Sequence, residues 1–333
     1  MSSGSLLDVY DTLLLDLDGT VYRGSRAVEG AARAVGAAHQ AGVRVRFVTN
    51  NASKAPALVA EHLSALGVPA APEEVATSAQ AGARMLAARI AEGSLVLVVG
   101  TDSLAAEVTA VGLRVTREYG PEVAAVVQGH SPETGWSILA EACMAIRAGA
   151  VWVACNADPT LPTERGQLPG NGSMVAALRA ATGASPEVAG KPEPGLFSGA
   201  VLEAGARRAL VVGDRLDTDI AGASAAGLDS LLVLSGVTTP AELLAAPPGF
   251  RPHYLGADMS ALSDPPGALE IGDRPGWHVA TADGVLRIGT DGTGAEPLEL
   301  VRALCAPAWA SGVSLIEPAD ERARVVARSL GLL

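Results

Sequence analysis

Short apolar runs alternate with polar stretches along most of this chain, and their lengths suit buried strands. Runs at 13–15, 43–48 and 209–212 are rich in Leu and Val, and further runs lie at 95–99, 124–127 and 151–154. A helical pattern over 137–148 separates two of these runs. Strands that alternate with helices predict an α/β fold built on parallel sheets.

Three of these strands end in clusters of polar residues. The clusters are Asp16-Leu17-Asp18-Gly19-Thr20, Thr49-Asn50-Asn51, and Gly213-Asp214 through Asp219. Open parallel sheets bind their ligands at the carboxyl ends of their strands. We therefore expect the three clusters to contribute to one site.

The first cluster places two carboxylates at alternate positions of an extended segment. Asp16 and Asp18 then face the same side, and Gly19 lets the backbone approach a ligand closely. Two like charges held this close are costly unless a cation lies between them. An ordinary Asp-Gly turn is the structural alternative for this segment taken alone.

A fourth candidate segment is Gly190-Lys191-Pro192-Glu193-Pro194. The chain has 24 Lys plus Arg, yet its only lysines are Lys54 and Lys191. A compact ammonium on a flexible stem suits a crowded phosphate site and is not interchangeable with a guanidinium. Because lysine is so rare in this chain, Lys191 indicates a functional cation. The alternative is that a lysine stands at this position by chance.

With 333 residues, the chain is longer than a typical single domain. About 140 residues separate the Thr49-Asn50-Asn51 cluster from the Gly190-Lys191-Pro192 segment, more than one crossover needs, so an inserted domain is expected. We predict a discontinuous catalytic core at 8–79 and 186–255, an inserted α/β cap at 80–185, and an extension at 256–333. The extension follows a Pro-Pro-Gly linker at 265–267 and has a hairpin pattern at 277–288, then helical patterns at 298–310 and 317–333.

Composition limits the partners and the cellular compartment. The net charge of −12 and pI near 4.9 oppose broad contact with nucleic acid. The three cysteines have no metal-ligand or redox spacing, and we expect them to be buried thiols in a reducing compartment. No apolar run is long enough for a membrane span, and the N-terminus lacks a secretory pattern. We therefore expect a cytoplasmic protein, and leave open a homodimer through the cap or extension.

The four segments, in this order and spacing, resemble the motifs of the haloacid dehalogenase-like phosphatases. Thr49-Asn50-Asn51-Ala52-Ser53 and Gly213 to Ile220 further resemble the NagD-like subgroup, which includes glycerol 3-phosphate, phosphoglycolate and 4-nitrophenyl phosphatases. The resemblance covers about residues 8 to 255. It implies a Rossmann-like, doubly wound parallel core with an inserted α/β cap and, here, a small C-terminal α/β extension. Some bacterial glycerol 3-phosphate phosphatases of the subgroup carry an acetyltransferase-like fragment in that place.

The resemblance also implies a role for each motif residue. Asp16 would attack phosphorus, while Asp18 would protonate the leaving alkoxide and later deprotonate water. Mg²⁺ would be held by the Asp16 carboxylate, the Asp18 carbonyl and Asp214, with Asp219 orienting a metal water or Lys191. The remaining phosphoryl contacts would come from Thr49, Lys191, Leu17, Gly19, Asn50 and Asn51.

Substrate choice would lie in the cap, for which the candidates are His130, Asn156, Asp158 and Leu161. The similar pyridoxal phosphatases carry a histidine in this loop where the chain has Leu161, so the resemblance disfavours an aromatic ring substrate. The Thr-Asn-Asn-x-Ser-Lys form of the second motif favours glycerol 3-phosphate or phosphoglycolate. A surface histidine and a Pro-rich turn are the structural alternatives for these residues.

Glycerol 3-phosphate is the substrate we expect, and five alternatives remain open. The chain could instead hydrolyse phosphoglycolate, a nucleoside monophosphate, or a broad set that includes 4-nitrophenyl phosphate. It could also be a phosphomutase or a catalytically silent sugar-phosphate sensor, although every residue that the chemistry requires is present.

Overall fold

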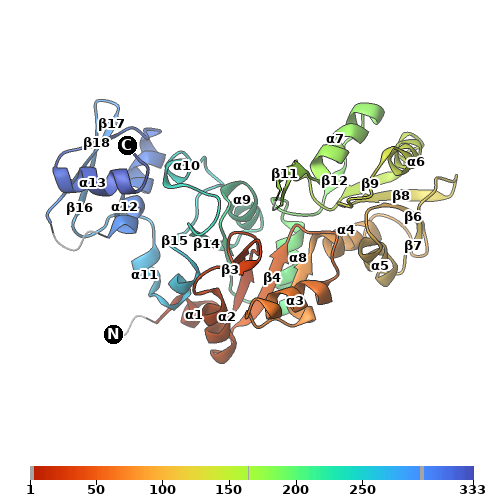
Figure 1. Cartoon of the computed structure of the whole chain (residues 1–333), viewed down its shortest axis with the longest axis horizontal. Coiled ribbons are helices and arrows are strands. Elements are labelled where there is room, and N and C mark those ends of the chain that lie inside the picture. Colours follow the sequence, from red (N-terminus) through yellow and green to blue (C-terminus); the bar gives the residue numbers. More distant parts are fainter. Residues whose placement is uncertain (1–3, 164, 293–295) are drawn as a thin grey trace. The chain divides into compact units, whose positions relative to one another are not determined.

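The computed structural model describes residues 4–163, 165–292 and 296–333. The chain forms two compact units, one made of Met1–Val45 with Ala206–Leu333 and the other of Arg46–Gly205. Figure 1 shows the elements of both in chain order. Each unit is α/β and carries its own parallel strands.

In the first unit, four parallel strands lie in the order β15-β14-β13-β1. They span Tyr254–Gly256, Asp229–Val233, Ala209–Gly213 and Thr12–Leu15. All residues of β1 and β13 are buried, and the register pairs Leu15 with Val212. Because the strands are parallel, Asp16 and Asp214 follow them at the same edge of the sheet.

Short helices and turns connect these strands. The elements are α1 (Leu6–Val9), β2 (Tyr22–Arg23), β3 (Arg26–Ala27), α2 (Ala31–Gln40), α9 (Ala221–Ala225), α10 (Pro240–Leu244), a 3₁₀ turn (Met259–Ser263) and α11 (Pro266–Leu269). A π-helical turn spans Leu216–Ile220 and runs into α9. Single π turns occur often at functional sites, and this one carries Asp219.

The second unit contains two sets of parallel strands. β4 (Arg44–Thr49) begins in the first unit, and its final residues pair with β5 (Val75–Thr77), Thr49 opposite Thr77. A five-stranded sheet follows in the order β12-β9-β8-β6-β7, with bounds Glu187–Val188, Val151–Ala154, Val123–Gln128, Leu95–Val99 and Arg114–Thr116.

Helices cover both faces of the five-stranded sheet (Figure 1). α6 (Trp136–Arg147) and α7 (Asn171–Thr182) pack on one face around Trp152 and Val126. α4 (Ser78–Ala87) and α5 (Asp102–Ala110) lie on the other face. The unit also contains α3 (Pro56–Ala65), a 3₁₀ turn (Pro72–Glu74), α8 (Gly195–Ala204) and the antiparallel hairpin β10 (Thr160–Thr163) and β11 (Gly166–Pro169).

The C-terminal extension forms a three-stranded mixed sheet with two helices. Strands β16 (Trp277–Ala282), β17 (Val285–Thr290) and β18 (Ile316–Pro318) accompany α12 (Pro297–Ser311) and α13 (Glu321–Ser329). Its apolar residues share one core cluster with Leu232, Leu243 and Leu255 of the first unit. Arg302 is buried and donates to the carbonyl of Leu255 from Nε (3.1 Å) and Nη2 (2.7 Å). The extension is therefore part of this unit's core and not a tethered domain.

The predicted fold class is confirmed: parallel α/β sheets, an inserted α/β sheet, and a small C-terminal α/β extension. All six strands predicted from the apolar runs form, the hairpin predicted at 277–288 forms as β16 and β17, and the helical pattern over 137–148 is α6. The helix predicted over 317–333 begins only at Glu321, because residues 316–318 pair with β17 and Asp320 caps the helix through Ala323 N–H (2.8 Å). Across the described residues, none of the helices combines the length and apolar character needed to cross a bilayer.

Candidate active site

Three carboxylates converge at the carboxyl edge of the first unit's sheet. Asp16, Asp214 and Asp219 each have a carboxylate oxygen, and these atoms lie within 4.8 Å of one another. Asp214 and Asp219 are buried, while Asp16 is partly exposed. Hard oxygen donors gathered at one point with an opening to solvent are what a Mg²⁺-sized cation needs.

The backbone around these carboxylates approaches them closely. Asp16 N–H donates to Val212 C=O at 2.9 Å, which continues the β1–β13 pairing by one residue. Gly19 has φ +92°, and a Cβ there would overlap the Asp214 carboxylate. A Cβ at Gly236 would overlap the same carboxylate. The glycines at 19 and 236 therefore make room for Asp214.

Backbone amides orient the two buried carboxylates. Val237 N–H donates to Asp214 Oδ2 at 2.7 Å, and Arg215 N–H donates to Asp219 Oδ2 at 3.1 Å. Each bond fixes the direction in which its carboxylate points. Asp217, between them, turns outward and pairs with Arg215 at 2.7 Å. Asp214 and Asp219 thus belong to the acidic group, whereas Asp217 lies outside it.

Asp18 lies beside the carboxylate group with its side chain exposed. Tyr22 is nearby: burial first, and then the carboxylates of Asp18 and Asp16, raise the pKa of its hydroxyl above the ordinary value. In the same turn Gly19 N–H donates to Tyr22 C=O at 2.8 Å, and Leu17 C=O accepts from Val21 N–H at 2.9 Å. The exposed Asp18 carboxyl is in a position to exchange protons with solvent or a ligand.

The remaining core-motif candidates belong to the second unit. Thr49, at the end of β4, is 5% exposed, and its hydroxyl accepts from Asn51 N–H at 3.1 Å. Asn51 Oδ1 accepts from the N–H groups of Ser53 (2.8 Å) and Lys54 (3.2 Å). Asn51 and Ser53 therefore shape the turn after β4, whereas Lys54 is exposed.

Lys191 is buried, with 4% of its surface exposed. Its Nζ donates to Val48 C=O at 3.2 Å and lies 5.9 Å from the centre of the Phe197 ring. The ammonium is therefore buried beside the end of β4, and a compact positive charge at that place can bind an anionic group. Lys191 and Pro192 are joined by a cis peptide bond.

Of the four cap candidates, two contact the turn after β4. Asn156 Nδ2 donates to Asn50 C=O at 2.8 Å, and Asp158 Oδ2 accepts from Asn50 Nδ2 at 3.2 Å. His130 is partly exposed just beyond β8. Leu161 is partly exposed in β10, opposite Leu168 of the hairpin. The loop at 156–158 is therefore hydrogen-bonded to the second motif of this unit.

Sequence reasoning missed three residues near these groups: Tyr22, Ser78 and Gly236. Ser78 donates its hydroxyl to Asn50 C=O at 2.6 Å. Gly236 did carry a signal in the sequence. The Ser-Gly pair to which it belongs follows the apolar run of β14, just as the other site segments follow apolar runs. Tyr22 and Ser78 carry no such signal.

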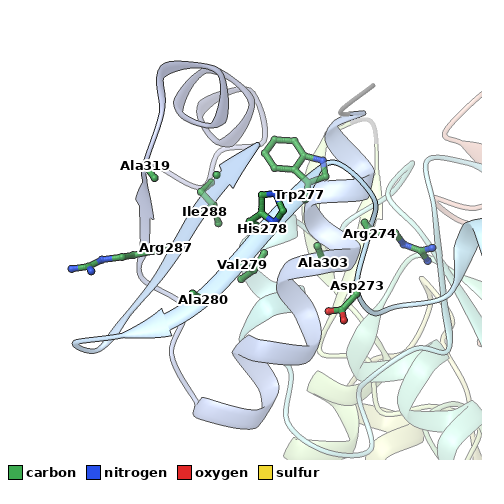
Figure 2. Close-up of a pocket in the computed structure, with 11 residues that line it drawn as sticks. Asp273, Arg274, Trp277, His278, Val279, Ala280, Arg287, Ile288, Ala303 and Ala319 are labelled. Atoms are coloured by element: carbon green, nitrogen blue, oxygen red, sulfur yellow. The ribbon is translucent and has the colours of Figure 1, made fainter. Parts of the chain in front are cut away.

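A separate pocket of about 490 Å³ lies in the C-terminal extension (Figure 2). It is lined by β16, β17 and α12, with Trp277 and Ile288 among its apolar residues. Its two arginines are engaged elsewhere: Arg274 pairs with Glu299 at 3.2 Å, and Arg287 pairs with Asp283 at 3.2 Å. The pocket therefore offers little positive charge to an anionic ligand.

Comparison with known proteins places the chain in a family. Residues 13–114 match the model of the haloacid dehalogenase-like hydrolases, and residues 188–262 match a second model described as HAD-hydrolase-like. A D-glycerol 3-phosphate phosphatase of Mycobacterium tuberculosis is 48% identical over 99% of this chain and 96% of the relative. This chain belongs to the haloacid dehalogenase-like hydrolases. It is a phosphatase of that family, as its motifs had indicated.

Two further comparisons extend this result to other relatives. A 5′-nucleotidase of Bacillus subtilis is 39% identical over 70% of this chain and 90% of its own length. The crystal structure of the M. tuberculosis glycerol phosphate phosphatase in complex with magnesium superposes with a TM-score of 0.95, at 50% identity and 99% coverage of both chains. Residues 274–332 match a GCN5-related N-acetyltransferase-like domain.

Proposed function

We propose that this phosphatase hydrolyses glycerol 3-phosphate to glycerol and phosphate, with Mg²⁺ as its cofactor. The observation that carries the chemistry is the group formed by Asp16, Asp214 and Asp219 at one edge of a parallel sheet. The observation that carries the substrate is the 48% identity to a D-glycerol 3-phosphate phosphatase along almost the whole chain. The second relative makes a nucleoside monophosphate the main competing substrate.

The residues present fit a magnesium ion. Three carboxylates offer hard oxygens within 4.8 Å of one another, and Gly19 and Gly236 keep the space beside Asp214 clear of side chains. Asp16, Asp214 and the Asp18 carbonyl would hold the ion, and Asp219 would orient a water on the ion or Lys191. When bound, Mg²⁺ neutralises phosphate oxygens that would otherwise repel a nucleophile.

Asp16 is the proposed nucleophile. Its carboxylate oxygen forms a bond to phosphorus while the bond from phosphorus to the glycerol oxygen breaks, which leaves an aspartyl-phosphate. Asp18, whose side chain is exposed, is the proposed general acid that gives a proton to the departing alkoxide. A water then attacks phosphorus, Asp18 takes a proton from that water, and the bond from Asp16 to phosphorus breaks to release phosphate.

Lys191 and Thr49 are proposed to bind the phosphoryl oxygens during both steps. A buried ammonium gives a strong local positive charge in a chain whose net charge is −12. The Thr49 hydroxyl accepts from Asn51 N–H, which directs its own proton toward another acceptor. Both residues would therefore stabilise the charge of the transferring group.

The test is a substrate panel with the purified full-length chain. Glycerol 3-phosphate, phosphoglycolate, nucleoside monophosphates, pyridoxal phosphate and 4-nitrophenyl phosphate are compared by kcat/KM with and without Mg²⁺. We expect glycerol 3-phosphate to give the highest value, and EDTA to remove activity that added Mg²⁺ restores. A higher kcat/KM for a nucleoside monophosphate would assign the nucleotidase function instead.

The acidic net charge supports a protein that works on small metabolites without binding nucleic acid. We propose a cytoplasmic location and leave a homodimer through the cap or the extension as the assembly to test by light scattering.

A further inference from the structure

Asn50 of the second motif makes several hydrogen bonds to distant parts of its unit, and its side chain is turned toward Lys191. Asn50 Oδ1 accepts from Lys191 N–H at 2.8 Å, and Asn50 Nδ2 donates to Lys191 C=O at 3.0 Å. One amide thus binds both backbone polar groups of a single residue that lies 141 positions away. Because one group is a donor and the other an acceptor, only this orientation of the amide satisfies both.

The segment around Lys191 is built to accept this contact. A Cβ on Gly190 would lie 2.5 Å from Asn50 Oδ1 and 2.6 Å from Cys155 C=O, closer than any side chain tolerates. The glycine of the Gly-Lys-Pro motif therefore allows the amide of Asn50 to reach the backbone of Lys191. The presence of glycine there is explained by this approach and not by a positive φ.

Asn50 is itself held in place by three residues from two other segments. Its carbonyl accepts from Ser78 Oγ at 2.6 Å and from Asn156 Nδ2 at 2.8 Å, and its Nδ2 donates a second bond to Asp158 Oδ2 at 3.2 Å. Ser78 begins α4, while Asn156 and Asp158 precede the hairpin of β10 and β11. These bonds leave the amide no freedom to turn toward a ligand without releasing Lys191.

We propose that Asn50 is a positioning residue that acts through Lys191, and that the carboxylate of Asp158 fixes the Asn50 amide for this task. This inference rests on the proposed role of Lys191 as the ammonium that binds the phosphoryl group. It changes the role expected from the motif alone, which placed the Asn50 amide on the phosphoryl group itself. It also gives Asp158 a role in orienting Asn50 in place of direct contact with the substrate.

The distinguishing experiment is a double-mutant cycle between Asn50→Ala and Lys191→Met. The affinity for inorganic phosphate in the presence of Mg²⁺ is measured by calorimetry, so that variants without turnover still give a value. We expect each single substitution to weaken phosphate binding by about tenfold or more, and the double variant to be within about threefold of Lys191→Met. Losses that multiply in the double variant would show that Asn50 contacts phosphate directly and would overturn the proposal.

Failure of the proposed function gives a different pattern. If Lys191→Met binds phosphate as the unmodified chain does, Lys191 does not bind the phosphoryl group. The positioning role of Asn50, which depends on that binding, is then overturned as well. If only Asn50→Ala leaves affinity unchanged, the role of Lys191 stands and the positioning proposal alone is overturned. A merely structural role for Asn50 would lower Tm without changing the phosphate affinity of the folded protein.

A second pair of substitutions applies if Asn50→Ala does not fold. Asn50→Asp is nearly isosteric but puts an oxygen against Lys191 C=O and the Asp158 carboxylate, so we expect about a tenfold loss in kcat/KM. Adding Asp158→Asn supplies an N–H that can donate to this oxygen, and should recover about threefold or more. Asp158→Asn alone keeps an acceptor for Asn50 and should lose less than Asn50→Asp. Absence of recovery in the double variant would overturn the role of Asp158.

Discussion

Gly236 lies directly against the Asp214 carboxylate, and a Cβ at position 236 would overlap both Asp214 Oδ2 and Cγ. The next residue, Val237, donates its N–H to the same oxygen at 2.7 Å. The turn after β14 thus holds a carboxylate that follows β13. The geometry of the acidic group depends on a strand that carries none of its acids.

Gly236→Ala should therefore weaken cation binding. The added methyl group must displace the Asp214 carboxylate, so we expect the Mg²⁺ concentration for half-maximal activity to rise by about tenfold or more. Gly36→Ala is the control, since nothing lies within 4 Å of a Cβ there and alanine favours α2. An unchanged Mg²⁺ dependence of Gly236→Ala would show that Asp214 does not bind the ion.

Asp16→Asn should abolish turnover and leave the fold intact. The amide has nearly the same shape but does not form the acyl phosphate, so we expect kcat to fall by about 10³-fold or more, with Tm within about 5 °C. Asp217→Asn is a matched control, because that carboxylate is exposed and pairs with Arg215 outside the acidic group. Sustained multiple turnover by Asp16→Asn would contradict a role as nucleophile.

The three cysteines should differ in how fast thiol reagents label them. Burial raises the pKa of the Cys155 thiol to about 12 and that of Cys305 to about 12, whereas Cys143 is partly exposed. Since the thiolate is the reactive form, only Cys143 should be labelled quickly in the native protein at pH 7.5. Mass spectrometry after brief iodoacetamide treatment measures this, with Cys143→Ser as control. Rapid labelling of Cys155 in that variant would contradict its burial.

Asp11 should make the stability of the chain depend on pH in an acidic window. Burial acts to raise the pKa of its carboxyl, but hydrogen bonds from Thr12 and the amides of Arg207 and Arg208, with the charge of Arg44, lower the pKa to about 2. A carboxyl with a lowered pKa stabilises the fold above its unfolded-state pKa, near 3.9, and loses that contribution as pH falls toward 2.

Comparison with Asp11→Asn isolates this contribution. At pH 7 we expect the variant to unfold with a free energy lower by about 1 kcal/mol, since Asp11 is partly exposed and solvent screens its pairs. The difference should shrink between pH 4 and pH 2, as followed by urea unfolding. A difference that stays constant over this range would contradict the lowered pKa.

Arg302→Lys should loosen the C-terminal extension. The guanidinium donates twice to Leu255 C=O and pairs with Glu299 at 2.7 Å, and an ammonium does not span these groups. We expect a loss of about 1–3 kcal/mol in the free energy of unfolding, since the site is buried. Arg324→Lys, whose exposed pair with Glu321 spans 3.2 Å, should change stability by less than about 0.5 kcal/mol. Equal effects of the two substitutions would contradict the role given to Arg302.

The sequence by itself determined the strands and the acidic motif. Apolar runs such as 95–99 and 209–212 become buried strands because their length and Val-Leu content suit no exposed element. The polar ends of β1 and β13 predicted that Asp16 and Asp214 would meet, since parallel strands end at the same edge. The helix predicted from residue 317 was wrong at its start, because pairing with β17 overrides local helical preference.

Only the tertiary structure decided what each polar side chain contacts. Asp217 and Asp219 are alike in sequence, yet the π turn buries Asp219 beside Asp214 and leaves Asp217 outside. The amide of Asn50 meets the backbone of Lys191 across 141 positions, a relationship without any local pattern. Periodicity records which face of a strand or helix is buried, whereas hydrogen-bond partners depend on how distant segments are brought together.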